Sequence, residues 1–254
     1  MTTNSFSTTI YTNTQQVSVI KNYIVHAKAL FIFAHGAGAD KSHQFMQSVS
    51  EKLNDQYINV LRFNFPYMDK RLLDGKKYPP NRMPILVDCY QEIVQYFLNN
   101  KAELTIDFEL AKSIKLTNHV KSDNKKNNMP IFIGGKSMGG RVAATLTAQN
   151  IKIAKQIKGV VCIGYPFHPQ KKPENLRLTP LQSTTNSMLI LQGERDALGD
   201  KSEIENYDLP NLCKVIYFSD GDHDLKPRIK SGFTHQHHIK IATNEIVRFI
   251  DEKS

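Results

Sequence analysis

The sequence has few cysteines, and their arrangement excludes most of the chemistry that cysteine supports. Its 254 residues include three, Cys89, Cys162 and Cys213. They lie far apart in apolar segments, and an odd number without paired spacing fits neither a structural metal site nor a redox motif. We expect free thiols in the core and a reducing, cytoplasmic environment.

The sequence also lacks long hydrophobic runs. No apolar stretch approaches the roughly 20 residues that a helix needs to span a bilayer. Residues 1–14 are polar and lack the basic start and apolar centre of a secretory signal. We therefore expect a soluble, unprocessed protein with no membrane span.

Acidic residues are outnumbered, 24 against 33 lysines and arginines, which gives a formal net charge of +9. The basic residues are scattered, and their densest runs, at 70–77 and 121–128, contain few aromatic residues. Sites that stack nucleic-acid bases need aromatic side chains among the basic ones. We expect the charge to cover a solvated surface and predict no nucleic-acid partner.

The chain length and its hydrophobic pattern predict a single α/β domain over residues 1–254. Two β-rich segments, 6–11 and 17–25, are expected to form an antiparallel edge within residues 1–28. Continuous apolar runs of the kind found in buried parallel strands follow at 29–34, 58–65, 131–134, 159–164, 188–192 and 214–218. Helices are expected at 42–53, 85–99 and 239–250, with a long proline-containing loop between Pro66 and Pro84 and a polar insertion at 101–128. This alternation predicts a mostly parallel sheet with helices on both faces.

One segment combines a strand, a tight turn and a helix. The apolar run 129–134 leads into Gly135-Lys136-Ser137-Met138-Gly139, and a helix of small residues follows at 141–149. This is the nucleophile-elbow arrangement, in which the turn exposes a serine Oγ to a base. Gly135 and Gly139 avoid the crowding that a Cβ would cause, so Ser137 is the predicted nucleophile. A phosphate-binding loop is excluded because Pro130 stands where its first glycine is needed.

The strand at 29–34 ends in a glycine-rich turn, residues 35–39. Gly36 allows the backbone to turn, and the N–H groups of Ala37 and Met138 are the predicted donors to a developing oxyanion. Dinucleotide binding is disfavoured because the turn lacks a third glycine and the next strand ends in Asn64, which supplies no acid for a ribose. His35 is expected to make structural hydrogen bonds.

Two polar side chains follow later strands. Asp196 comes after the strand at 188–192 and His223 after the strand at 214–218, which completes the order Ser, Asp, His. Asp196 would orient the imidazole, and His223 would move the proton between Ser137 and the leaving group. The alternatives are a helix N-cap for Asp196 and a surface-loop histidine for His223, with Glu174 as the reserve acid.

Two other clusters resemble metal sites. The Asp-x-Asp-x-Asp spacing at 220–224 is typical of a calcium loop, but Leu225 and Ser231 replace the required glycine and glutamate. Three histidines at 235–238 begin the last helix, where residues two apart do not share a face. We predict no metal site.

Together, these motifs resemble the α/β-hydrolase superfamily. They are Gly-Gly-Lys-Ser-Met-Gly-Gly-Arg at 134–141, His-Gly-Ala-Gly at 35–38, Leu-Gln-Gly-Glu-Arg-Asp at 191–196 and Gly-Asp-His at 221–223. From about Leu30 onwards the chain is similar to the branch that contains testis-expressed protein 30 and is related to dienelactone hydrolase-like proteins. The resemblance implies an eight-stranded hydrolase fold, Ser137, Asp196 and His223 as the triad, and no metal or organic cofactor. The branch also includes a subunit of a chromatin acetyltransferase complex, so the motifs alone do not guarantee turnover.

The expected activity is hydrolysis of small carboxylic esters or thioesters through an acyl-enzyme on Ser137. The segment 165–183 is too short for a full cap domain, so we expect an open, shallow pocket. Basic residues at 70–82 and 171–177 would rim this pocket and favour anionic substrates. The alternative is a non-catalytic α/β-hydrolase-like module that binds a protein or an anionic partner. Peptidases share the same residues, and the oligomeric state is left open.

Overall fold

The computed structural model describes residues 4–100 and 129–254. The expected polar insertion at 101–128 lies outside the described residues. In the described part of the chain, every helix is too short or too polar to cross a lipid bilayer.

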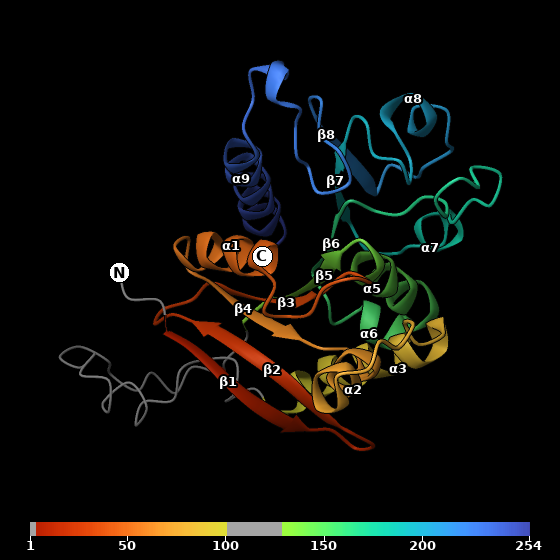
Figure 1. Cartoon of the computed structure of the whole chain (residues 1–254). Coiled ribbons are helices and arrows are strands. Elements are labelled where there is room, and N and C mark those ends of the chain that lie inside the picture. Colours follow the sequence, from red (N-terminus) through yellow and green to blue (C-terminus); the bar gives the residue numbers. More distant parts are fainter. Residues whose placement is uncertain (1–3, 101–128) are drawn as a thin grey trace.

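Eight strands form one sheet in the order β1-β2-β4-β3-β5-β6-β7-β8 (Figure 1). Their bounds are β1 (Asn4–Tyr11), β2 (Gln16–Tyr23), β3 (Ala29–Ala34), β4 (Ile58–Phe63), β5 (Ile131–Lys136), β6 (Gly159–Ile163), β7 (Met188–Gly193) and β8 (Cys213–Phe218). The strand β2 runs antiparallel to β1 on one side and to β4 on the other. All pairs from β4 to β8 are parallel. The predicted mostly parallel sheet is therefore confirmed.

Helices cover both faces of the sheet, as the alternating pattern predicts (Figure 1). One face carries α1 (Gln44–Asn54) and α9 (His235–Lys253), which contact each other. The other face carries α2 (Pro66–Asp74), α3 (Met83–Asn99), α5 (Met138–Gln149) and α6 (Ile151–Ala154). Two short helices, α7 (Thr179–Gln182) and α8 (Lys201–Ile204), lie in the connections that flank β7.

The strand β3 shows why such apolar runs form the centre of the sheet. All six of its residues are buried, because neighbouring strands and both helical layers cover it. Successive side chains point to opposite faces, so Leu30 and Ile32 pack with α3 and α5. Phe31 and Phe33 pack with α1 and α9 on the opposite face. The alternation places β3 between two hydrophobic layers and next to the strand that leads to Ser137.

The expectation of one long loop between Pro66 and Pro84 is wrong, because its first part is the helix α2. Pro66 is at the first position of α2, where the missing N–H costs no hydrogen bond and the fixed φ favours the helix. The helix ends at Asp74 and is capped by Gly75, which has a left-handed φ of 72°. Pro66, which was expected to lie in a loop, is thus the first residue of a helix. Pro84 likewise lies in the first turn of α3.

Candidate active site

Ser137 lies at the sharp turn between β5 and α5. Its backbone has φ 53° and ψ −117°, a conformation that side-chain-bearing residues seldom adopt. The flanking glycines permit this turn to press against the end of β3. A Cβ on Gly139 would lie 2.6 Å from the Ala34 carbonyl oxygen, and one on Gly135 would meet the same oxygen at 2.6 Å. Any side chain at either glycine would push the elbow away from the sheet.

The structure brings the three predicted side chains into one hydrogen-bonded chain. His223 Nε2 lies 2.8 Å from Ser137 Oγ, and His223 Nδ1 lies 2.8 Å from Asp196 Oδ2. Each residue comes from a loop after a different parallel strand, β5, β7 or β8. The carboxyl ends of parallel strands meet at one edge of a sheet, which is why residues 86 positions apart can touch.

Asp196 is completely buried, and its carboxylate is held from several directions. The Gln192 side-chain amide donates to Asp196 Oδ2 at 2.8 Å, and the Leu198 backbone N–H donates to Oδ1 at 2.9 Å. These bonds leave Oδ2 facing His223, where it can accept the Nδ1 proton. Sequence reasoning overlooked Gln192, because its position at the end of a buried strand shows nothing about where its amide points.

The alternative roles considered for the acids do not match their positions. The N-cap of α8 is Asp200, not Asp196, and Asp200 forms a capping box with Glu203. The reserve acid Glu174 is exposed, and its carboxylate accepts a hydrogen bond from Asn175. The structure therefore does not bring Glu174 to His223.

Lys136, the residue before the nucleophile, ties the elbow to the histidine loop. Its ammonium donates to the His223 carbonyl oxygen at 2.7 Å and pairs with an Asp224 carboxylate oxygen at 3.1 Å. Burial lowers the pKa of Lys136 from its usual value, while the charge of Asp224 opposes that shift. The sequence places Lys136 in the elbow motif but predicts no contact for its side chain. The available signal was a lysine at the end of an otherwise apolar strand.

The backbone N–H groups of the two predicted oxyanion donors belong to residues beside Ser137. Ala37 and Met138 line the same cavity as Ser137. Met138 is the first residue of α5, where a helix leaves backbone N–H groups without intrahelical acceptors. Neither the Ala37 N–H nor the Met138 N–H bonds to another described residue. A Cβ on Gly36 would approach the Ser137 Cβ to 3.5 Å, which shows how closely the glycine turn passes the serine.

A tyrosine on the helix α2 contacts the glycine turn at residues 35–39. Tyr67 is buried, and its hydroxyl oxygen lies 3.0 Å from the Ala37 carbonyl oxygen and 3.3 Å from that of Gly36. The Tyr67 backbone N–H donates to the Asn81 side chain at 2.9 Å. Because this segment was expected to be a loop, sequence reasoning could not predict that Tyr67 supports the turn.

His35 has the structural role that its position suggested. It is fully buried, its Nδ1–H donates to the Gly36 carbonyl at 2.6 Å, and its Nε2 accepts the Phe65 N–H at 3.1 Å. Burial lowers the pKa of His35 to about 4. The ring is therefore neutral near pH 7, and it joins the glycine turn to the start of α2.

A cavity of about 380 Å³ opens at Ser137. This volume lies within the usual range for small-molecule pockets, about 300–1,000 Å³. Its apolar walls include Met83, Leu86, Met138, Pro166 and Leu198. Polar groups enter it from Asn81, Arg141, Gln170 and Arg177. The connection from β6 to β7 contributes only the four-residue α7 as regular structure, so this connection forms no separate domain over the opening.

The three aspartates at 220, 222 and 224 bond to different partners and do not form one site. Asp220 pairs with Arg195 and Arg228, and hydrogen bonds from Arg228 lower the pKa of the Asp220 carboxyl to about 2. The Asp222 carboxylate accepts backbone N–H groups within its own loop, and Asp224 pairs with Lys136. Residues 4–100 and 129–254 contain no group of three or more histidine, cysteine or acidic side chains arranged to hold a metal.

The three thiols are free and differ in burial. Cys89 and Cys162 are buried, which raises the pKa of both thiols. Cys213 is half-buried on the edge strand β8, and partial burial raises its pKa to about 11. The expectation of core thiols is thus met fully by two residues and partly by the third.

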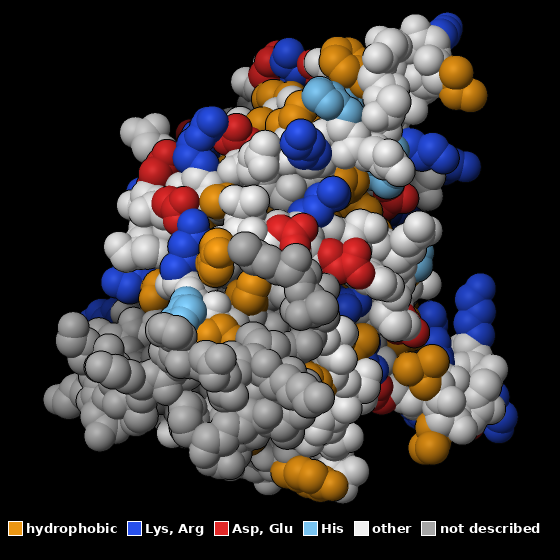
Figure 2. Space-filling view, turned by 90° about the vertical axis from the view of Figure 1, so that its left-hand side faces the viewer, with side chains coloured by type: hydrophobic (Ala, Val, Ile, Leu, Met, Phe, Trp, Pro, Cys, Tyr) orange, Lys and Arg blue, Asp and Glu red, His pale blue; other side chains and the backbone are white. Residues whose placement is uncertain are grey.

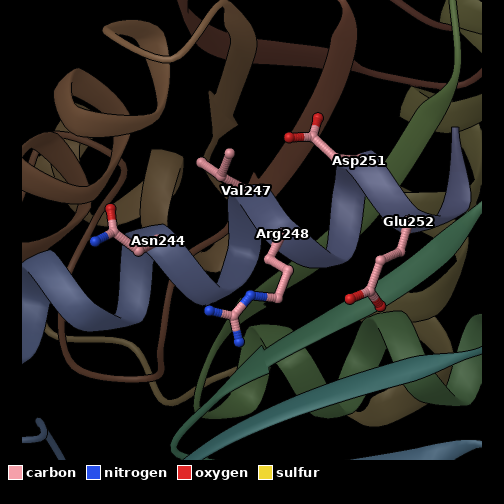
Figure 3. A pocket seen from close by; sticks show the side chains of 5 residues that line it. All are labelled: Asn244, Val247, Arg248, Asp251 and Glu252. Atoms are coloured by element: carbon pink, nitrogen blue, oxygen red, sulfur yellow. The ribbon is translucent and has the colours of Figure 1, made fainter.

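Another hollow, of about 480 Å³, lies on the outer face of α9 (Figure 3). All its lining residues come from this one helix: Asn244, Val247, Arg248, Asp251 and Glu252. Arg248 pairs with Glu245 on the same helix, and Asp251 pairs with Lys28. Because one helix supplies all of its lining, this hollow is a surface groove. None of the five lining side chains is a serine, cysteine or threonine.

On the face shown in Figure 2, lysine and arginine side chains are interspersed with acidic and uncharged ones. The scattered basic residues of the sequence thus form no continuous stripe over the described part of this face.

Comparison with known proteins agrees with this fold. A family model described as an alpha/beta hydrolase domain matches residues 27–114 and 109–251. Among solved structures, a dienelactone hydrolase from Anabaena variabilis superposes with a TM-score of 0.65 at 13% identity, covering 99% of this chain and 98% of that one. An esterase from Pyrococcus furiosus gives 0.64 at 14% identity, covering 99% and 92%. A serine hydrolase without lid from Xanthomonas campestris gives 0.62 at 14% identity, covering 99% and 96%.

Proposed function

The chain belongs to the alpha/beta hydrolase family, and from this premise we propose that it is a serine hydrolase of small carboxylic esters or thioesters. The observation that carries the proposal is the continuous contact from Ser137 Oγ through His223 to the buried Asp196, with two distances of 2.8 Å. The family match agrees with the expected superfamily. The assignment of roles to these residues is our inference from their geometry.

In the proposed reaction, Ser137 Oγ attacks the carbonyl carbon while His223 Nε2 takes the hydroxyl proton. The Nδ1–H of His223 remains bonded to Asp196, whose negative charge stabilises the imidazolium. The Ala37 and Met138 N–H groups would bind the oxyanion that forms on the carbonyl oxygen. Collapse of this intermediate expels the alcohol or thiol, which receives the proton from His223.

The second half of the reaction releases the acyl group. His223 removes a proton from a water molecule, and the resulting nucleophile attacks the ester bond between the acyl group and Ser137. The acid product leaves, and the proton on His223 returns to Ser137 Oγ. The residues that catalyse the first step thus also catalyse the second.

The cavity supports a small substrate. Apolar side chains supply one part of its wall, and the short β6–β7 connection forms no separate domain over it. We infer that short acyl chains suit it better than long ones. The free thiols are consistent with the reducing, cytoplasmic location that we propose for the protein.

The test is hydrolysis of 4-nitrophenyl acetate, butyrate and octanoate by the wild type and by Ser137→Ala. Removing a triad serine can lower kcat by about 10⁶-fold, so we expect only background activity from the variant. A fluorophosphonate should label the wild type and not Ser137→Ala. Ser202→Ala, which removes the hydroxyl of an exposed serine on α8, is the matched control and should keep both activity and labelling.

Two outcomes would contradict the proposal. Activity that survives in Ser137→Ala would place the chemistry elsewhere in the molecule. A folded wild type that neither hydrolyses the esters nor reacts with the fluorophosphonate would favour the alternative of a non-catalytic binding module.

A further inference from the structure

Two arginines line the active-site cavity, and neither has an acidic partner among the described residues. Arg141 lies on α5, about one turn after Ser137, and Arg177 lies in the connection between β6 and α7. Both residues are half-buried. Within the part of the chain that the structure describes, neither guanidinium forms an ion pair or a hydrogen bond.

The positive charges of the two arginines repel each other. Burial lowers the pKa of Arg141 from its usual value, and the positive charge of Arg177 lowers it further. The described residues that line the cavity include no aspartate or glutamate. Two partly desolvated like charges raise the free energy of the empty cavity, and an anion between them would relieve that cost.

We propose that Arg141 and Arg177 form a carboxylate-binding subsite, and that the substrate is an ester or thioester carrying a carboxylate a few carbons from its reactive carbonyl. The ester part of this inference rests on the proposed function, whereas the carboxylate subsite rests on the arginines alone. A planar guanidinium offers parallel N–H donors that match the two oxygens of a carboxylate, and such bonds are stronger than neutral ones.

The position of Arg141 limits how far the carboxylate is from the ester. Four helical residues advance about 6 Å along the axis, so the base of the Arg141 side chain is close to Ser137. A cavity of about 380 Å³ must hold both the carbonyl group at Ser137 and the anion at the arginines. A short ester that carries one carboxylate meets both requirements, with the carboxylate in either the acyl or the alcohol part.

The experiment compares matched anionic and neutral esters. For the acyl part, the pair is mono-4-nitrophenyl adipate and 4-nitrophenyl methyl adipate. For the alcohol part, the pair is 4-acetoxybenzoate and its methyl ester. The readout is the ratio of kcat/KM for the anionic ester to that for the neutral ester, so differences in intrinsic reactivity cancel between protein variants.

For one of the two pairs, we expect this ratio to be about tenfold lower in Arg141→Gln and in Arg177→Gln than in the wild type. This is the effect expected from the loss of one charge-assisted hydrogen bond. Arg141→Lys keeps the charge but not the paired donors and should give an intermediate ratio. Arg248→Gln removes the same charge from the distant groove on α9 and should leave the ratio unchanged. An unchanged ratio in both cavity variants, or an equal fall in Arg248→Gln, would overturn the subsite.

Binding measured without turnover separates this inference from the proposed function. Calorimetric titration of the Ser137→Ala variant with monomethyl adipate, and separately with 4-acetoxybenzoate, should show binding that either arginine substitution abolishes. If the arginines are needed for binding but the wild type hydrolyses no ester, the subsite is supported and the hydrolase is rejected. An active hydrolase in which neither probe binds in an arginine-dependent way would retain the enzyme and reject the subsite.

Discussion

Lys136 shows how a residue outside the Ser-His-Asp set can act on it. Its ammonium is buried between the nucleophile elbow and the loop that carries His223, and it bonds to the backbone of that histidine. The contact fixes the loop without touching the imidazole ring. Lys136 is therefore a positioning residue in the proposed mechanism.

Replacing Lys136 with methionine tests this role. A hydrogen bond from a charged donor contributes about 1.5–3 kcal/mol, so we expect Lys136→Met to lower kcat about tenfold or more while KM changes little. Asp224→Asn removes the ion pair but leaves the Lys136 bond to the His223 carbonyl, and should cost much less. An equal loss in both variants would show that the ion pair, not the carbonyl contact, holds the loop.

The sequence predicts the three residues of the proposed triad but not the side chains that hold them in place. The positions of Ser137, Asp196 and His223, each directly after a predicted parallel strand, were enough to propose them, because parallel strands bring their carboxyl ends to one edge of the sheet. The contacts of Gln192 with Asp196 and of Lys136 with His223 could not be predicted, since they depend on side-chain directions between distant loops.

At the scale of elements, the strands and the four longest described helices could be predicted, whereas α2 and the four-residue helices α6, α7 and α8 could not. Continuous apolar runs are distinctive for strands buried on both faces, which the uniform burial of β3 to β7 explains. The effect of a proline on a helix depends on its position. Inside a helix a proline breaks it, whereas in the first turn a proline favours it. The signals that α2 offered were Pro66 at its start and Gly75 at its end.

The helix α2 matters for the site because it carries Tyr67. Tyr67→Phe removes the hydroxyl that contacts the Ala37 carbonyl, and we expect the free energy of unfolding to fall by about 1 kcal/mol. We also expect kcat to fall, because the turn that presents the Ala37 N–H loses a support. Urea unfolding and ester hydrolysis measure the two effects.

The matched control is Tyr78→Phe, which removes a hydroxyl bonded to Asp74 at the exposed end of the same region. Surface changes of this kind usually alter stability by less than about 0.5 kcal/mol. If both variants behave alike, the Tyr67 contact does not support the turn.

For the whole molecule, His35 links folding stability to pH. Its pKa is about 4 in the folded protein against 6.5 for an ordinary histidine, so between these values the unfolded chain binds the extra proton. The stability that the neutral ring contributes is complete above pH 6.5 and is lost as the pH falls towards 4. At 1.36 kcal/mol per pKa unit, the loss is about 2 kcal/mol by pH 5 and about 3 kcal/mol by pH 4.

Urea unfolding at pH 7.5, 6 and 5 measures this loss before most carboxylates titrate. His35→Gln should flatten the dependence, whereas replacing the exposed His237 with glutamine should leave it as in the wild type. A wild type whose unfolding free energy does not change over this range would show that His35 is not kept neutral by burial.

The backbone of Ser137 has one further consequence, for efforts to engineer the protein. A non-glycine residue in such a conformation costs on the order of 1–3 kcal/mol, which the contacts of the elbow with β3 must offset. Glycine at this position would remove both that cost and the proposed nucleophile. In the proposed hydrolase, folding stability and turnover are therefore opposed at this residue, so we expect variants selected only for heat resistance to lose activity.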